Sequence, residues 1–303
     1  MKDKLKNLVK SISQGPLQPF FSLGCRALNM AEYRVLSVIW YLSGARKPSR
    51  EEAQWMTEQV TFIYKSFERQ KMAKRLYRNI QSYYPGVRVI IADDSSKPLE
   101  LKGENLTVLQ LPYNSGLSYG LNRALEQVET PYVIRMDDDE LLTPYTRFEM
   151  QLKLMMKYPQ IDMVGVLPYT APGLRKIEKV AQDYMKNPVN CKPDMFGVVR
   201  YHWIDKTHVI LNRTPNIFLV KTEKLRAVGY DDNIRMLDHT EFFIRAAGII
   251  HTVMDTTSFV FHYHDCFDWN YIQYRRDIDG DYTYIEKKLA RLDREKQEAL
   301  LKR

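Results

Sequence analysis

Four consecutive carboxylates, Asp137-Asp138-Asp139-Glu140, are the part of the sequence with the clearest chemical potential. Like charges at this spacing repel one another, so the run costs stability unless something offsets the repulsion. It follows the mostly apolar residues 133–136, where we expect a buried strand. Oxygen ligands suit Mg²⁺ or Mn²⁺, and alternate residues of an extended chain face the same side. Asp137 and Asp139 are therefore the natural metal-binding pair, and a solvated acidic turn is the alternative.

Alternating strands and helices are predicted to position this run. Apolar stretches predict strands at 60–64, 87–92, 106–111, 132–136 and 163–167, with helices at 68–83, 117–125 and 144–157 between them. This alternation indicates a mainly parallel α/β sheet with helices on both faces. Ligands bind beyond the carboxyl ends of such strands, where both Asp93-Asp94 and the acidic run lie.

The later part of the chain is predicted to be less regular at first. Proline-punctuated residues 168–215 predict loops and an inserted helix. Order resumes with a strand at 217–220, helices at 221–228 and 238–247, and a strand at 258–261. A charged helix is expected from Tyr282 to the end of the chain.

Four motifs in order carry a resemblance to a known family. Residues 89–96 are similar to V-x-V-V-D-D-G-S, 114–125 to N-x-G-L-x-x-A-L-N-R-G-L, 131–140 to Y-I-x-R-M-D-A-D-D, and 143–151 to P-x-R-L-x-x-Q. Together they resemble the family 2 type of GT-A fold glycosyltransferases. The resemblance implies a Rossmann-like, nucleotide-sugar-binding sheet, here with helical N- and C-terminal extensions.

The resemblance also implies roles for individual residues. Asp137 and Asp139 would hold Mn²⁺ or Mg²⁺ on the donor diphosphate, and His262 would complete the metal shell, with His264 two residues further on. A histidine with no metal role is the alternative. The residues implied to bind the nucleotide-sugar are Asp93, Asp94, Asn114, Gly116, Asn122 and Asp138. A simple turn and helix cap is the alternative for the pair at 114 and 116.

A second stretch, residues 238–245, resembles the acceptor-site helix of inverting family members, where a carboxylate takes the proton from the attacking hydroxyl. It is also similar to the H-x-E-F-F segment of ganglioside-type β1,4-N-acetylgalactosaminyltransferases. The base is open between Glu241, our first choice, then Asp238 and His239. Surface charges flanking buried Phe242 and Ile244 are the alternative.

Charge and composition limit the class of protein, its partners and its location in the cell. The 303 residues are 45% hydrophobic and 27% charged, as in ordinary globular proteins. The formal net charge is +8, but residues 1–50 hold nine Lys or Arg against two Asp or Glu, so seven of the eight charges lie there. This pattern favours an anionic membrane surface over nucleic acid as the partner. Three scattered cysteines and the lack of a signal or spanning segment favour a cytoplasmic protein, peripheral on the inner face of the cytoplasmic membrane.

We therefore expect an N-terminal extension (1–50), a GT-A domain (51–268, with halves at 51–165 and 166–268) and C-terminal helices (269–303). The expected activity is inverting, metal-assisted transfer of a hexosyl or N-acetylhexosaminyl group, as in polysaccharide biosynthesis. The donor is a UDP-sugar and the acceptor a glycan or lipid-linked hydroxyl. One alternative is a non-catalytic relative that binds a glycan or a partner. A sugar nucleotidyltransferase is less favoured because residues 65–69 contain no glycine.

Overall fold

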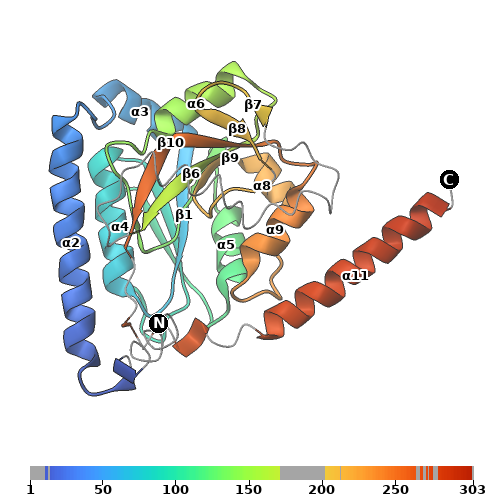
Figure 1. The fold of residues 1–303 in the computed structure, drawn as a ribbon, viewed down its shortest axis with the longest axis horizontal. Coiled ribbons are helices and arrows are strands. Elements are labelled where there is room, and N and C mark those ends of the chain that lie inside the picture. The colour runs from blue at the N-terminus through green and yellow to red at the C-terminus, as the bar shows by residue number, and fades with distance from the viewer. Residues whose placement is uncertain are drawn as a thin grey trace, which may run out of the picture.

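The computed structural model describes residues 11–301 except 13, 171–201, 212, 264–266, 269–270, 272 and 276–278. Its strands form one ten-stranded sheet with helices on both faces (Figure 1). The α/β fold class expected from the sequence is confirmed. Most of the inserted segment expected within residues 168–215 lies outside the described residues.

The first part of the chain contains these elements: α2 (Gln18–Leu42), α3 (Arg50–Gln59), β1 (Val60–Ser66), α4 (Gln70–Tyr83), β2 (Arg88–Asp93), β3 (Leu106–Gln110), α5 (Leu117–Glu126), β4 (Tyr132–Arg135), β5 (Glu140–Leu141), α6 (Phe148–Lys157) and β6 (Met163–Thr170). The second part contains these: β7 (His202–Trp203), β8 (His208–Ile210), β9 (Phe218–Lys221), α8 (Thr222–Val228), α9 (Asp238–Ala246), β10 (Thr252–His262), the short 3₁₀ helix η1 (Gln273–Arg275) and α11 (Asp279–Leu301).

Strands β3, β2, β1 and β4 are parallel neighbours and form one half of the sheet. Strands β1, β2 and β4 are mostly buried and apolar on both faces because helices cover both, whereas the edge strand β3 is partly exposed. In β1, Phe62 and Tyr64 face a core shared with α3, α4 and α6, whereas Ile63 faces a second core with α5, α8 and α9. This arrangement brings the carboxyl ends of β1 and β4 together at one edge.

The other half of the sheet is mixed. Strand β9 runs antiparallel between β4 and β6, and β10 runs parallel to β6 and antiparallel to β8 and β5. The strand expected at 258–261 begins earlier, at Thr252, because β10 continues through an irregularity between Met254 and Phe259. There Asp255 accepts hydrogen bonds from the backbone of Thr257 and Ser258.

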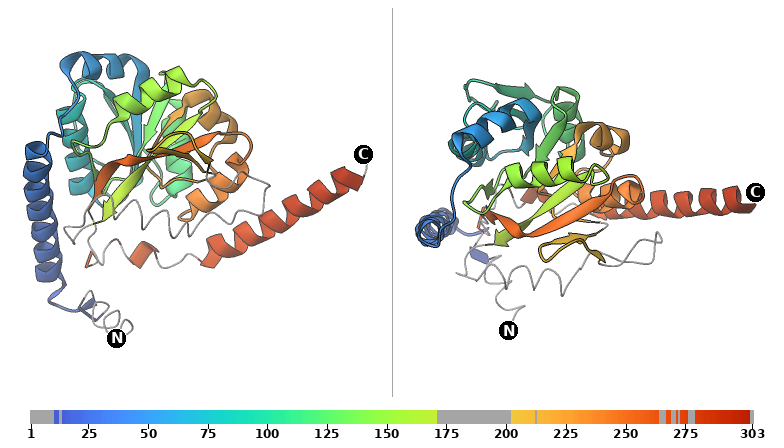
Figure 2. Two further views of the ribbon diagram at one scale, coloured as in Figure 1. Left: turned by 45° about the horizontal axis from the view of Figure 1, so that its top comes forward. Right: turned by 90° about the horizontal axis from the view of Figure 1, so that it is seen from above.

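Within the N-terminal extension, residues 18–42 form the single helix α2, which runs along one side of the body (Figure 2). Trp40 is 5% exposed and meets Phe259 edge-on, with 5.2 Å between ring centroids. The hydroxyl of Tyr33 donates to the carbonyl of Leu142 at 2.8 Å. A third core cluster therefore joins α2 to β6 and β10.

Helix α3 is not among the helices expected from the sequence. Ser49 and Glu52 form a capping box: the Ser49 hydroxyl accepts from the Glu52 N–H at 3.1 Å, and the Glu52 carboxylate accepts from the Ser49 N–H at 3.0 Å. The S-x-x-E spacing is a known helix-start signal and could have revealed this helix.

Candidate active site

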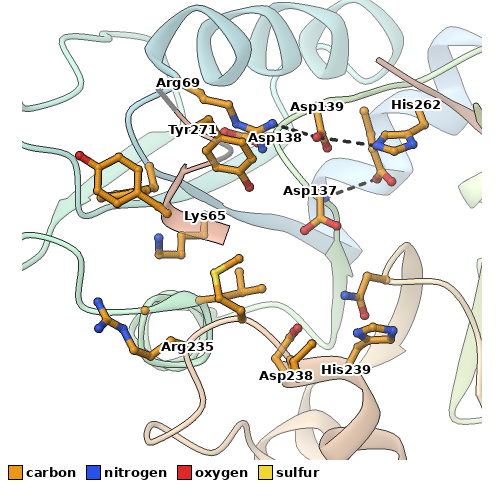
Figure 3. A pocket seen from close by; sticks show the side chains of 18 of the residues that line it. Lys65, Arg69, Asp137, Asp138, Asp139, Arg235, Asp238, His239, His262 and Tyr271 are labelled. Atoms are coloured by element: carbon orange, nitrogen blue, oxygen red, sulfur yellow. Dashed lines mark hydrogen bonds and ion pairs between the residues drawn. The ribbon is translucent and has the colours of Figure 1, made fainter. Parts of the chain in front are cut away.

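A cavity of about 590 Å³ lies at the carboxyl ends of β1 and β4, where the sequence places the acidic run. Its size suits a small-molecule site. Among its walls are the loops after β1, β3 and β4, the segment before α9 and the end of β10 (Figure 3). The titratable side chains that line it are Lys65, Arg69, Asp137, Asp138, Asp139, Glu140, Arg235, Asp238, His239 and His262.

Arg69 neutralises much of the acidic run. Its guanidinium pairs with Asp138 and lies 2.9 Å from Asp139, and its other face covers the ring of Tyr271 at 3.7 Å. Burial raises the pKa of Asp138. Burial also acts on Asp139, but Arg69 and His262 outweigh it and hold the pKa of that carboxyl well below its usual value. The negative charge of the run is thus offset in part by protein cations.

The three residues expected to bind metal, Asp137, Asp139 and His262, all line the cavity. Asp139 Oδ2 lies 3.7 Å from His262 Nε2, whereas Asp137 turns toward Arg135, with 3.0 Å between Oδ1 and Nη2. Within the described residues no three His, Cys, Asp or Glu side chains already converge as a metal site. The donors nevertheless fit a divalent cation, because carboxylates and an imidazole line the same cavity and Asp138 Oδ2 is buried with no hydrogen-bond partner among the described residues. His264 lies outside the described residues.

Asp238, the first residue of α9, lies across the cavity from Asp139 (Figure 3). It is 2% exposed, and neither carboxylate oxygen has a hydrogen-bond partner among the described residues. Burial raises its pKa to about 6, although the nearby Arg135 acts in the opposite direction. Burial lowers the pKa of the adjacent His239 to about 3, with contributions from Arg213 and Arg135, so this imidazole is neutral near pH 7.

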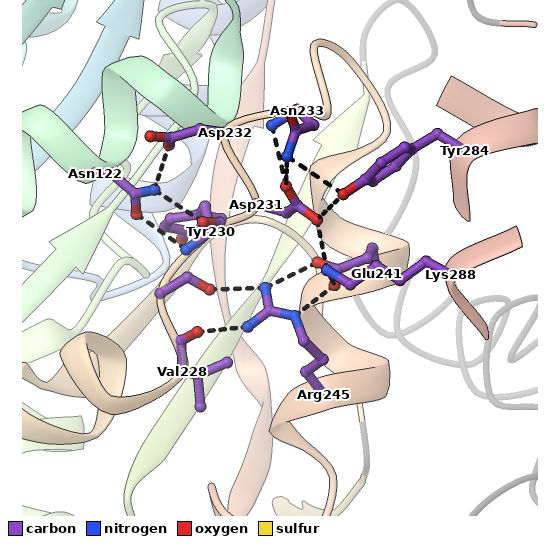
Figure 4. Close-up of polar contacts among 11 residues, drawn as sticks. Asn122, Val228, Tyr230, Asp231, Asp232, Asn233, Glu241, Arg245, Tyr284 and Lys288 are labelled. Carbon is purple, nitrogen blue, oxygen red and sulfur yellow. Dashed lines mark hydrogen bonds and ion pairs between the residues drawn. The ribbon is translucent and has the colours of Figure 1, made fainter. Parts of the chain in front are cut away.

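Glu241, the first choice for the base, does not line the cavity. Its carboxylate is 2.8 Å from Arg245 Nη2 and 2.6 Å from Lys288 Nζ, in the contact between α9 and α11 (Figure 4). Arg245 also donates to the carbonyls of Val228 and Gly229. A carboxylate held by two cations away from the cavity is a poor proton acceptor, so the geometry favours Asp238.

The residues expected to bind the nucleotide divide into two groups. Asn114, Gly116 and Asp138 line the cavity. The side chains of the other three form hydrogen bonds with other residues of the chain: Asp93, Asp94 and Asn122.

These three residues hold the loops around the cavity. Asp93 accepts from the N–H of Leu99 at 2.7 Å, and Asp94 accepts from the N–H of Gly116 at 3.1 Å. Gly116 has a φ of 106°, a conformation that favours glycine. Asn122 donates to the carbonyl of Tyr230 at 2.8 Å. Of the residues that they contact, Gly116 lines the cavity, whereas Leu99 and Tyr230 belong to neighbouring segments.

Several cavity residues had no signal in the sequence. Lys65, Arg69 and Arg235 are separated basic residues with no motif around them, and each is brought to the cavity by the fold. Lys65 Nζ lies 2.6 Å from Asp94. Arg235 donates to the carbonyl of Asn114 at 2.7 Å and has no carboxylate partner within the described residues.

Comparison with known proteins identifies related sequences. The profile of Glycosyl transferase family 2 matches residues 61–228, just over half of the chain. Beta-1,4 N-acetylgalactosaminyltransferase 2 of Mus musculus is 32% identical over 189 residues, covering 62% of this chain and 36% of that protein. Beta-1,4 N-acetylgalactosaminyltransferase 1 of Homo sapiens is 31% identical over 199 residues, with the same coverage. The chain thus spans about a third of the length of these curated relatives.

Solved structures with related folds include TarS 1–349 of S. aureus in complex with UDP-GlcNAc, at 14% identity and a TM-score of 0.49, covering 67% of this chain and 58% of that one. The mannosyltransferase PcManGT from Pyrobaculum calidifontis, in complex with GDP-Man and Mn²⁺, is 13% identical with a TM-score of 0.46, covering 78% and 68%.

Proposed function

Because the chain belongs to glycosyl transferase family 2, we propose that it transfers a sugar from a UDP-linked donor, with inversion, to a hydroxyl of a glycan or lipid-linked acceptor. The observation that carries the proposal is the buried carboxylate of Asp238, which faces the cavity without a hydrogen-bond partner in the described part of the chain. The names of the two animal relatives favour an N-acetylhexosamine as the transferred sugar.

Asp238 is the proposed general base. In its carboxylate form it accepts the proton of the acceptor hydroxyl while that oxygen forms a bond to the anomeric carbon. The bond from this carbon to the diphosphate breaks, and its electron pair leaves with the diphosphate oxygen. A pKa of about 6 leaves most of the carboxylate ionised at neutral pH and still basic enough to take a proton. The neutral imidazole of His239 lies beside it and can donate a hydrogen bond to a sugar hydroxyl or accept one from it.

Asp137, Asp139 and His262 would hold Mn²⁺ or Mg²⁺. When bound, the ion would offset the charge that develops on the leaving diphosphate. Arg69 already holds the Asp139 carboxylate in place on the cavity wall. Asn114 and Gly116 would border the nucleotide.

The effect on nucleotide binding would be indirect for three residues, which hold loops near the cavity by hydrogen bonds: Asp93, Asp94 and Asn122.

We also propose that the N-terminal extension binds an anionic membrane surface, as on the inner face of the cytoplasmic membrane. No helix in the described residues is both long and apolar enough to cross a bilayer. Helix α2 instead exposes a mostly apolar face, which includes the following side chains: Phe20, Leu23, Leu28, Val35, Val38 and Leu42. With the basic residues of the first fifty, this face suits a helix lying in the membrane interface.

A donor screen tests the proposed activity. The thermal midpoint of the purified chain is measured with a panel of UDP-sugars, each with and without Mn²⁺, and the stabilising donor is then incubated with glycan and lipid-linked acceptors. A metal-dependent rise in midpoint, followed by an acceptor product heavier by one sugar residue, supports the proposal. Binding without transfer or donor hydrolysis would indicate a non-catalytic relative, and release of diphosphate from a sugar phosphate and UTP would indicate a nucleotidyltransferase.

A further inference from the structure

The first turn of the C-terminal helix α11 lies against the wall of the cavity. Asp281, which is 6% exposed, accepts three backbone hydrogen bonds from the segment before α9. Its Oδ1 accepts from the N–H of Arg235 at 3.1 Å, and its Oδ2 from Met236 at 2.7 Å and Leu237 at 3.0 Å. All three of these donors belong to residues that line the cavity.

This segment leads directly into Asp238. Helix α9 has Leu237 at its N-cap, and the N-cap side chain makes no capping hydrogen bond. A helix start without its own cap depends on other groups to fix the path of the chain. The Asp281 carboxylate, from a distant part of the sequence, takes this role.

The same segment is held from its other side. The N–H of Leu117, at the start of α5, donates to the carbonyl of Arg235 at 3.0 Å. Further back, Asp231 accepts from Tyr284 at 2.9 Å and pairs with Lys288 at 2.5 Å, both on α11 (Figure 4). Residues 231–237 are therefore clamped between α5 and α11.

We propose that Asp281 is a positioning residue, which holds the backbone of residues 235–237 so that the carboxylate of Asp238 faces the acceptor hydroxyl. The inference rests on the proposed function, because it assigns Asp281 an effect only through the base. Helix α11 is then part of the catalytic unit, although its later part extends away from the body (Figure 1).

The test compares Asp281→Ala and Asp281→Asn with Tyr282→Ala as the control, since Tyr282 is the next residue of α11 and is 53% exposed. The turnover number for transfer, the KM for acceptor and the Kd for UDP-sugar are measured for each variant. A displacement of about 1 Å can cost about 100-fold in rate, so Asp281→Ala should lower kcat by about 10- to 100-fold with donor Kd and binding stoichiometry unchanged. Asp281→Asn keeps one acceptor oxygen and the shape of the side chain, so its kcat should fall less than that of Asp281→Ala.

A double-variant comparison separates positioning from a general loss of folded protein. In an Asp238→Asn background there is no base to misplace, so adding Asp281→Ala should change the residual rate by less than about twofold. An equal fall in rate in both backgrounds, or an unchanged kcat in Asp281→Ala alone, would overturn the positioning role. Wild-type transfer by Asp238→Asn alone would show that the base assignment has failed, and the positioning role would fail with it.

Discussion

Arg135 and Asp238 form a buried ion pair beneath the cavity, with 3.5 Å between Nη2 and Oδ2 and side chains that are 0% and 1% exposed. The same guanidinium lies 3.0 Å from Asp137 and donates to the carbonyl of Asn216. One buried cation thus links the proposed base to the proposed metal-binding run. Because a buried charge is stable only when it is paired, Arg135 keeps both carboxylates close to it.

Replacing the proposed base should greatly slow transfer without disturbing the donor site. We expect Asp238→Asn to lower kcat by about 10²- to 10⁴-fold, the usual contribution of general base catalysis, with donor Kd unchanged. The control is Glu241→Gln, which removes a charge one turn away outside the cavity and should keep kcat within about tenfold of wild type. Wild-type turnover by Asp238→Asn, measured by product mass, would refute the assignment.

Transfer should depend on pH through Asp238. Its pKa is raised to about 6, so the protonated, inactive form accumulates as the pH falls through 6. We expect kcat to be level above pH 7 and to fall about tenfold per pH unit below about 5.5. The profile is measured at saturating donor and metal. A level kcat between pH 5 and 7 would count against Asp238, as would the same acidic limb in Asp238→Asn.

Metal binding should depend on Asp139. Loss of a carboxylate ligand should weaken Mn²⁺ binding by about 100-fold or more, since loss of even an outer hydrogen bond costs about 10- to 100-fold. Titration calorimetry of Asp139→Ala with Mn²⁺ and UDP measures this, with Asp205→Ala, on the β7–β8 hairpin, as the matched control. Near wild-type affinity or turnover in Asp139→Ala would remove Asp139 from the metal site.

Membrane binding should depend on the exposed face of α2. Leu28 and Val35 are 68% and 52% exposed and lie two turns apart. Burial of such a side chain is worth about 1.5–3 kcal/mol, so the double variant Leu28→Asp/Val35→Asp should lose most of its binding to vesicles of phosphatidylserine and phosphatidylcholine. Ile249→Asp, at a 47% exposed apolar position on the body, is the control. Equal co-sedimentation of the α2 variant and wild type would refute the proposal.

Helix α2 should also contribute to the stability of the whole fold. Trp40 contacts the rings of Tyr145, Tyr169 and Phe259, so Trp40→Ala should lower the free energy of unfolding by about 3–5 kcal/mol. Tyr41→Ala, at a 59% exposed position, should cost less than about 1 kcal/mol. Urea denaturation followed by tryptophan fluorescence and circular dichroism compares the two variants. Equal midpoints would show that α2 is only loosely attached.

The regular elements were largely predictable because their signals are local. Apolar runs marked β1, β2 and β4, and the motifs placed the acidic run beyond β4. The early start of β10 was not predictable, because Thr252 to Asp255 mixes polar and apolar residues and is strand only through pairing with β6 and β8. Helix α3 had a local signal in its capping box, Ser49 with Glu52, although it was not among the expected helices.

The candidate site was predictable in its residue types but less so in its roles. Asp238 and Glu241 are three residues apart, a spacing that makes two residues neighbours on a helix, so spacing alone does not show which one faces the cavity. The ion pairs of Glu241 with Arg245 and Lys288 distinguish the two carboxylates, because they hold Glu241 away from the cavity. Lys288 comes from another helix, so this contact has no local signal in the sequence. The internal hydrogen bonds of Asp93 likewise depend on the fold of its loop.

Strand β9 (Phe218–Lys221) is the only link between β4 and β6 within the described sheet. During synthesis on the ribosome, strands β1 to β4 can pair with one another early. The edge of β4 that pairs with β9 stays unpaired until the chain has been synthesised through residue 221. Pairing across such a long sequence separation is slow, and an open edge strand can pair with another chain. Refolding from denaturant should therefore be concentration-sensitive, with the uncovered β4 edge as the point where chains associate wrongly.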